Sequence, residues 1–594
     1  MTNAGVRESR IRWAWRLVAL LLAASHTWAA VAAESMNEDG IAYLDMGDAI
    51  FRGDWGMAVN SVWSPLYSSL LATTLHVFRP GIEWEFATVH LVNLFLFLLA
   101  LVCFEYYWGG LRVPFRRAAS RVMDHETLMP WWAWISIGYA LFLWSSLSLI
   151  RIWAVTPDML VAALVFLAAG LTLRMGAGQG QATARGHGVA LGLVLGFGYL
   201  AKAVLFPIAA VFFGALFVVA RRERWLRRFL GSAITVFLLL AMPWATFISV
   251  SEGSPTIGEA GRLTYLRYVN GVAYPFWEPG SGGAGEPVHA PRRISESPAA
   301  YEFASPVGGT YPLSYNPAFW YRGVEPRFDL AQQSGALLAS GLFYANLFAR
   351  ELGGFMAVLF ALLLVRAPRT AGTGGPPVSR ALVAVGIAAL ALYGLVLVEG
   401  RYIAPFVLLV LGGLLSEARL PPGEGYRKTM AAASVVMLFF VVLSIGLFNV
   451  EGLLKITGLD ASAPAVANAV PADATSAAGQ VEAARALQEL GVRPGEEISF
   501  VGYAFGAYFA RLAGVRVTRQ VPDAAAAEFW RADGRRVRAL LQDLLDGPRA
   551  VVTDWTPTGP SASRWRPLGE SPYHVYVDET LGSPASPAGQ PGSR

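Results

Sequence analysis

Acidic side chains stand in two short segments, each next to a long apolar run. The first segment reads Asn37-Glu38-Asp39-Gly40 and the second reads Thr156-Pro157-Asp158. A carboxylate in such a place can accept the proton of a hydroxyl group that attacks an electrophile. Capping is the simpler alternative for Asp39, and a favourable position at the positive end of a helix dipole is the simpler alternative for Asp158.

Two cations have a similar setting. Lys202 lies in Leu200-Ala201-Lys202-Ala203, and Arg401 lies in Glu399-Gly400-Arg401-Tyr402-Ile403-Ala404-Pro405. A cation beside apolar runs is costly unless it faces a polar cavity or snorkels to the membrane surface. If Lys202 and Arg401 converge, they could neutralise a phosphate leaving group. Snorkelling is the alternative for Lys202.

The elements that must position these side chains are membrane spans. Apolar residues make up 55% of the chain and charged residues 15%, against about 25% in soluble proteins. Mean hydropathy is +0.44. About eleven apolar runs are long enough to cross a bilayer. They lie near 14–33, 86–107, 130–150, 158–174, 188–202, 203–220, 229–251, 340–365, 381–398, 402–417 and 429–449. We therefore expect a mainly α, polytopic membrane protein.

Arg and Lys residues set the orientation of these spans. They cluster before the first run and after the second, sixth, eighth and tenth. With eleven spans these clusters share one side, which the positive-inside rule makes the cytoplasm. We expect a cytoplasmic N-terminus in the cell's inner membrane, with Asp39 and Asp158 on the periplasmic face. The first run also has a signal-peptide pattern ending near Ala30–Ala33, but we expect it to be retained as an anchor.

The remaining segments suggest a second domain. After the last run, predicted helices and strands alternate as in a small α/β domain outside the membrane. The expected organisation is a membrane domain at 1–455 with outer loops 34–85 and 252–335, a linker at 456–476, the α/β domain at 477–580 and a disordered tail at 581–594.

Other motifs narrow the chemistry less. The outer loop 252–335 interleaves aromatic and basic residues, among them Arg267 and Tyr311, which would suit sugar faces and lipid phosphates. A plain aromatic belt at the membrane surface explains them equally well. The single cysteine, Cys103, and the scattered histidines form no zinc-type cluster. There is no Gly-rich phosphate loop and no nucleophile elbow, and no nucleic-acid partner is expected.

In this order, the motifs resemble those of the C-type (GT-C) integral membrane glycosyltransferases. The relatives in view are the lipid A aminoarabinose transferase and the protein O-mannosyltransferases. The matching elements are Glu38-Asp39 with Tyr43, Ser64-Pro65-Leu66-Tyr67, Thr156-Pro157-Asp158, Leu200-Ala201-Lys202-Ala203 and Glu399-Gly400-Arg401-Tyr402-Ile403-Ala404-Pro405. Two positions depart from the family pattern, since Ser64 stands where a Lys is frequent and Ala203 replaces a Gly.

The resemblance implies an inverting transfer from a polyprenyl-phosphate sugar to a lipid, glycan or protein acceptor, by a hexosyl- or pentosyltransferase. It implies the following roles: Asp39 as general base, with Glu38 and Asp158 beside it; Lys202, Arg401 and Tyr402 at the donor phosphate; Tyr43, Arg267 and Tyr311 at the substrate. It also allows a divalent metal (Mg, Mn, Ca or Zn) between Asp39 and Asp158.

Two other classes stay open. A transporter or flippase would need polar groups in mid-membrane, for which His90 and Asn93 are the main candidates. A non-catalytic envelope assembly protein would use the C-terminal domain to recruit partners.

Overall fold

The computed structural model describes residues 3–32, 34, 36–112, 129–175, 181–220, 224–273, 285–303, 308–364, 377–418, 423–456, 479–559 and 561–577. Residues 457–476 of the predicted linker and the predicted tail at 581–594 lie outside these ranges.

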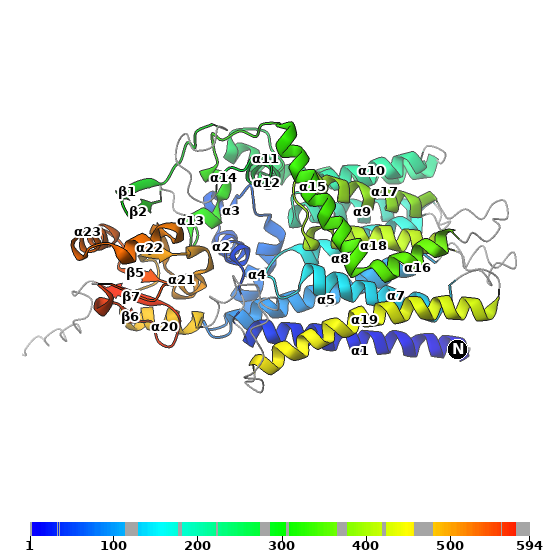
Figure 1. Ribbon diagram of the computed structural model, residues 1–594. Helices are drawn as coiled ribbons and strands as arrows, with labels where there is room; N and C mark the ends of the chain where they lie inside the picture. Colours follow the sequence, from blue (N-terminus) through cyan, green and yellow to red (C-terminus); the bar gives the residue numbers. More distant parts are fainter. Residues whose placement is uncertain are drawn as a thin grey trace, which may run out of the picture.

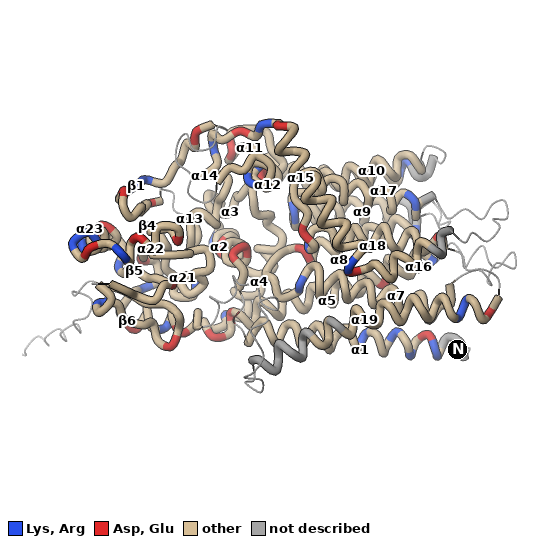
Figure 2. The backbone as a smooth tube through the Cα atoms, viewed as in Figure 1, with Lys and Arg blue, Asp and Glu red and all other residues tan. Residues whose placement is uncertain are grey.

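Long helices lie side by side and form one half of the molecule (Figure 1 and Figure 2). Each predicted apolar run falls on one of these helices, and Lys202 separates α9 from α10 as the sequence indicates. The helices are α1 (Asn3–Ala32), α5 (Glu85–Gly110), α7 (Trp131–Leu143) continued by η2 (Trp144–Ile150), α8 (Asp158–Met175), α9 (Gln181–Ala201), α10 (Leu205–Ala220), α11 (Arg224–Glu252), α15 (Leu330–Asn346) continued by η3 (Leu347–Glu351) and α16 (Gly353–Leu364), α17 (Pro377–Gly394), α18 (Gly400–Glu417) and α19 (Glu424–Ile456).

The length and composition of these helices confirm a multi-pass membrane protein. Within the described residues, six helices are long and apolar enough to cross a bilayer: Val6–Ala32, Glu85–Gly110, Trp131–Ile150, Arg227–Glu252, Gly400–Glu417 and Glu424–Leu447. Two shorter apolar helices, Leu205–Val219 and Val378–Gly394, accompany them. The total of eleven crossings and their orientation stay predictions.

The first helix is part of the bundle. Trp15 on α1 donates a hydrogen bond from its indole Nε1 to Ser136 Oγ at 3.0 Å, and Arg16 pairs with Glu105 on α5 at 2.6 Å. These contacts place α1 against α7 and α5, and its retention stays a prediction.

Short helices form a layer between the bundle and the C-terminal domain (Figure 1). The first outer loop supplies α2 (Glu38–Arg52), α3 (Trp55–Ala58) and α4 (Pro65–Phe78), close to the two amphipathic stretches that the sequence predicts. Proline in the first turn favours the start of α4, because its missing N–H needs no partner there. The outer loop 252–335 supplies α12 (Ala260–Tyr268), α13 (Pro312–Tyr315) and α14 (Pro317–Trp320).

The C-terminal domain contains a seven-stranded sheet with the order β1-β2-β4-β3-β5-β7-β6. Strand β3 pairs in parallel with both β4 and β5, and the other pairs are antiparallel. The strands are β1 (Arg292–Glu296), β2 (Ala299–Glu302), β3 (Glu497–Gly502), β4 (Arg516–Pro522), β5 (Ala550–Thr553), β6 (Arg566–Pro567) and β7 (His574–Val577). The helical elements are α20 (Gln480–Glu489), η5 (Ala504–Gly506), α21 (Tyr508–Ala513), α22 (Asp523–Arg531), α23 (Gly534–Leu544) and η6 (Ala562–Arg564).

The hairpin β1–β2 belongs to the outer loop 252–335, not to the segment predicted as the α/β domain. Strand β2 joins the sheet through Tyr301 opposite Gln520 and Glu302 opposite Arg519. The sheet is therefore built from two distant parts of the chain. It lies at the end of the molecule opposite the N-terminus of α1 (Figure 1).

Candidate active site

The first turn of α2 is fixed against the loop that precedes α8. The Val155 N–H donates to Asn37 Oδ1 at 2.6 Å, and Asn37 Nδ2 donates to the Val155 carbonyl at 3.4 Å. Gly40 allows this approach, because a Cβ atom there would lie 2.8 Å from Val155 Cβ. Asn37 occupies the N-cap position, so Asp39 does not cap the helix and its carboxylate is available for another role.

The same loop is held from the membrane side by Asn93 on α5. Its Nδ2 donates to the carbonyls of Ile152 at 3.1 Å and Ala154 at 3.0 Å, while its Oδ1 accepts from Tyr67 Oη at 2.7 Å. These bonds use both ends of the Asn93 amide, and the side chain is buried. Asn93 thus holds the loop before α8 in place, and its polar atoms are already used by these bonds. This weakens the transporter alternative, which would need Asn93 to contact a solute.

Asp158, Lys202 and Arg401 converge from three separate segments. Lys202 Nζ lies 2.5 Å from Asp158 Oδ1, and Arg401 Nε lies 3.9 Å from Asp158 Oδ2. The ammonium group of Lys202 also lies 3.7 Å from the ring centroid of Tyr402, a cation–π distance. Lys202 therefore faces a polar cluster and does not simply snorkel.

Asp39 joins this cluster through Arg401. Arg401 Nη1 lies 3.2 Å from Asp39 Oδ2, and Arg401 Nε lies 2.7 Å from Glu399 Oε2. The side chain of Asp39 is 34% exposed, whereas that of Asp158 is 2% exposed. Of these two carboxylates, only Asp39 is open to an incoming hydroxyl group.

These residues line one cavity of about 480 Å³. All of the predicted site residues except Tyr311 border it: Glu38, Asp39, Tyr43, Asp158, Lys202, Arg267, Arg401 and Tyr402. Tyr311, predicted at the substrate, does not line this cavity. Tyr311 is buried, and its hydroxyl donates to Gln520 Oε1 at 2.5 Å because the start of α13 faces the C-terminal sheet.

Tyr43 forms part of the floor of this cavity. It is buried, with its ring edge-on to Trp63 at 5.1 Å and to Tyr67 at 5.3 Å between centroids. Burial, and next the charge of Asp39, raise the pKa of the Tyr43 hydroxyl well above its usual value. The phenol therefore stays protonated and can position a neighbour, but it is no base at neutral pH.

The C-terminal domain contributes to the cavity, which was not predicted from the sequence. Phe505 lines the cavity, and the hydroxyl of Tyr503 contacts a carboxylate oxygen of Glu38. Both residues follow directly after β3. Ligand sites of α/β sheets gather at the carboxyl ends of parallel strands. The position of Tyr503 and Phe505 after a predicted strand could therefore have indicated that they belong to a site.

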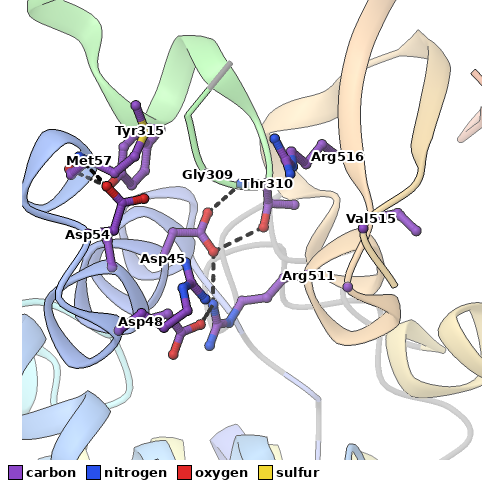
Figure 3. Close-up of a pocket in the computed structure, with 14 residues that line it drawn as sticks. Asp45, Asp48, Asp54, Met57, Gly309, Thr310, Tyr315, Arg511, Val515 and Arg516 are labelled. Carbon is purple, nitrogen blue, oxygen red and sulfur yellow. Dashed lines mark hydrogen bonds and ion pairs between the residues drawn. The ribbon is translucent and has the colours of Figure 1, made fainter. Parts of the chain in front are cut away.

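A second polar cluster ties the C-terminal domain to the outer loop (Figure 3). Arg511 on α21 lies 2.8 Å from both Asp45 and Asp48 on α2, and 3.0 Å from Glu85 on α5. The N–H and the hydroxyl of Thr310 donate to Asp45 at 2.6 and 3.0 Å. Burial lowers the pKa of Arg511, but the three carboxylates outweigh it and raise the pKa well above its usual value. The guanidinium therefore stays charged and joins the two parts.

The donor set does not fit the metal that the resemblance allows. Within the described part of the chain, no group of three or more His, Cys, Asp or Glu side chains could hold a metal ion. Asp39 and Asp158 already face Arg401 and Lys202. We therefore derive no step through a metal, and metal dependence stays an untested expectation.

The fold is that of the GT-C integral membrane glycosyltransferases. ArnT from Cupriavidus metallidurans bound to undecaprenyl phosphate superposes with a TM-score of 0.52 at 15% sequence identity, covering 96% of this chain and 99% of that protein. Its apo form gives a TM-score of 0.48 at 15% identity, covering 95% and 98%. An oligosaccharyltransferase from Archaeoglobus fulgidus gives 0.43 at 14% identity, covering 90% and 68%. No protein-family model and no curated protein matches the sequence.

Proposed function

We propose that the protein is a membrane glycosyltransferase that moves a sugar from a polyprenyl-phosphate donor to a hydroxyl group of an envelope acceptor, with inversion. The reaction would take place on the periplasmic face of the inner membrane. The GT-C fold supports this function, and so does the undecaprenyl phosphate bound to ArnT, a structural neighbour. The observation that carries the proposal is that Asp39, Asp158, Lys202 and Arg401 meet in one cavity.

In the proposed reaction the acceptor oxygen bonds to the anomeric carbon, and its proton passes to Asp39. The bond between the anomeric carbon and the phosphate oxygen breaks, and polyprenyl phosphate leaves. Lys202 and Arg401 would stabilise the charge on the phosphate, because fixed cations act strongly where charge develops. Asp158 is almost fully buried and 2.5 Å from Lys202. We assign it the role of holding Lys202 and Arg401 in place.

The contact between Arg401 and Asp39 has a consequence for the order of binding. The guanidinium of Arg401 lies 3.2 Å from the carboxylate of Asp39. A donor phosphate that engages Arg401 would compete with Asp39 for the same N–H groups. Asp39 would then be released to accept a proton, so we expect the donor to bind before the acceptor.

The proposal is tested by transfer of labelled sugar in proteoliposomes. A panel of undecaprenyl-phosphate hexoses and pentoses would serve as donors, and an envelope fraction from cells lacking the gene as acceptor. Asp39→Asn should lower the rate by about 10²-fold or more, the usual contribution of a general base. Asp54→Asn is the matched control, because Asp54 lies in the same outer loop but does not line the cavity.

Full transfer activity in Asp39→Asn would contradict the catalytic assignment. A solute flux that is insensitive to Asp39→Asn but sensitive to Asn93→Ala would favour a transporter instead.

A further inference from the structure

The residues directly after β3 are held in place by the side chain of Asp554. Gly502 has φ 120°, and a Cβ atom at this position would lie 1.8 Å from Asp554 Oδ1. Only glycine fits this conformation and this close approach. The next N–H, of Tyr503, donates to Asp554 Oδ2 at 3.2 Å. Asp554, directly after β5, thus holds the turn formed by Gly502, Tyr503, Ala504 and Phe505, which we call the 502–505 turn.

The 502–505 turn brings Phe505 to the cavity and holds Tyr503 beside it, where the Tyr503 hydroxyl contacts Glu38, a residue that lines the cavity. The ring centroids of Tyr503 and Phe505 are 5.5 Å apart. Tyr311 packs edge-on against Phe505, with centroids 4.8 Å apart, and is itself held by Gln520 on β4. Tyr311 therefore supports the wall of the cavity from behind instead of lining it.

Glu38 and Asp39 are neighbours in the sequence, but they face different parts of the molecule. Asp39 contacts Arg401 at the start of the membrane helix α18. Glu38 contacts Tyr503 of the C-terminal domain. The cavity is thus bordered by Lys202 and Arg401 of the bundle and by Phe505 of the 502–505 turn, and Tyr503 adjoins it through Glu38.

We propose that the 502–505 turn is the acceptor-binding wall of the site and that Tyr503 is a positioning residue, which orients Glu38 toward a hydroxyl-bearing acceptor. This inference rests on the proposed function. Rings beside a carboxylate suit such an acceptor, since the rings can cover an apolar face while the carboxylate accepts a hydrogen bond. Asp554 acts through the turn and does not touch the acceptor.

Steady-state transfer in proteoliposomes tests the inference, with an undecaprenyl-phosphate sugar as donor and the same envelope fraction as acceptor. Tyr503→Phe removes one hydrogen bond to a charged group, so the apparent KM for the acceptor should rise roughly tenfold. The KM for the donor should not change. Tyr576→Phe is the control, because Tyr576 lies on β7 of the same domain and does not line the cavity.

A pair of variants at Asp554 distinguishes loss of the hydrogen bond that holds the 502–505 turn from a general effect on folding. Asp554→Ala removes the acceptor of the Tyr503 N–H and should raise the acceptor KM as Tyr503→Phe does. Asp554→Asn keeps an oxygen acceptor and should retain the wild-type value. An unchanged acceptor KM in Tyr503→Phe, or a change in the donor KM alone, would overturn the inference while the proposed function stands. A wild-type protein that transfers no sugar from any polyprenyl-phosphate donor would overturn both.

Discussion

Arg401 lies within 4 Å of three carboxylates, and it thereby connects most of the charged groups of the cavity. Its partners are Asp39, Asp158 and Glu399, at 3.2, 3.9 and 2.7 Å. Of the three carboxylates only Asp158 is buried, with 2% of its side chain exposed, so loss of Arg401 would reduce the compensation of a buried charge there. The cluster is therefore a fixed arrangement, and a phosphate that enters it would exchange partners with groups already in place.

Lys202 offers the sharpest test at the scale of one residue. We expect Lys202→Met to lower kcat about 10²–10³-fold, since a fixed donor to a developing charge is lost and Asp158 loses its partner at 2.5 Å. The measurement is single-turnover transfer with saturating donor. Lys428→Met is the control, because Lys428 forms an exposed pair with Glu424 on α19. A kcat within twofold of wild type would exclude Lys202 from the phosphate site.

The site residues that could be predicted from the sequence are charged residues in apolar surroundings. Asp39, Asp158, Lys202 and Arg401 are charged groups next to apolar runs, and such groups are costly without a partner. Tyr311 gave no such signal. A tyrosine serves equally well in a cavity wall, in a membrane belt or as a buried support, and only its hydrogen bond to Gln520 decides between them.

At the scale of elements, α2 links the two halves of the molecule. Its first turn carries Glu38 and Asp39, and its middle carries Asp45 and Asp48, which bind Arg511. A shift of α2 would therefore move Asp39, the proposed general base, together with the interdomain contact.

Gly40 tests how closely α2 must approach the loop before α8. In Gly40→Val, the added Cβ would lie 2.7 Å from Met36 Sδ and 2.8 Å from Val155 Cβ, so α2 must move away. Overpacking of this kind typically costs about 1–3 kcal/mol. We expect a lower melting temperature and a greater than tenfold loss of transfer, since misplaced catalytic groups are strongly penalised.

The matched control is Gly56→Val on α3, where the nearest atom to an added Cβ is 3.7 Å away. Equal activity of Gly40→Val and Gly56→Val would show that the Asp39–Asp158 spacing tolerates movement.

Helices were easier to predict than strands for a physical reason. A membrane helix satisfies its backbone hydrogen bonds within one segment, so its apolar run is sufficient to find it. Strand β2 pairs with the neighbouring strand β1 on one side, but on the other side it pairs with β4, which lies far along the chain. Nothing in the sequence of β2 indicates that it pairs with β4. The outer loop 252–335 was therefore not predicted to be part of the sheet.

At the scale of the whole molecule, the C-terminal domain is part of the proposed site. Phe505 lines the cavity, Tyr503 contacts Glu38, and Arg511 lies among three carboxylates of the membrane half. Loss of the domain would open one side of the cavity and leave Asp45 buried against its own loop without a cation.

We expect truncation after residue 455 to abolish transfer and to lower the melting temperature in detergent. The buried carboxylates would lose Arg511, and β2 would lose its partner strand. Deletion of 581–594 is the control and should leave both quantities unchanged. A truncated protein with full activity would show that the domain is accessory. Function carried by the isolated C-terminal domain would instead favour an assembly protein.

The composite sheet also bears on how the protein is made. The hairpin β1–β2 emerges during synthesis well before β4, and four membrane helices of the bundle, α15–α16, α17, α18 and α19, separate the two in the chain. Until β4 has been made, the edge of β2 that β4 covers in the folded protein stays open to other strands. Mutants that are slow to complete the C-terminal domain should therefore aggregate through the hairpin.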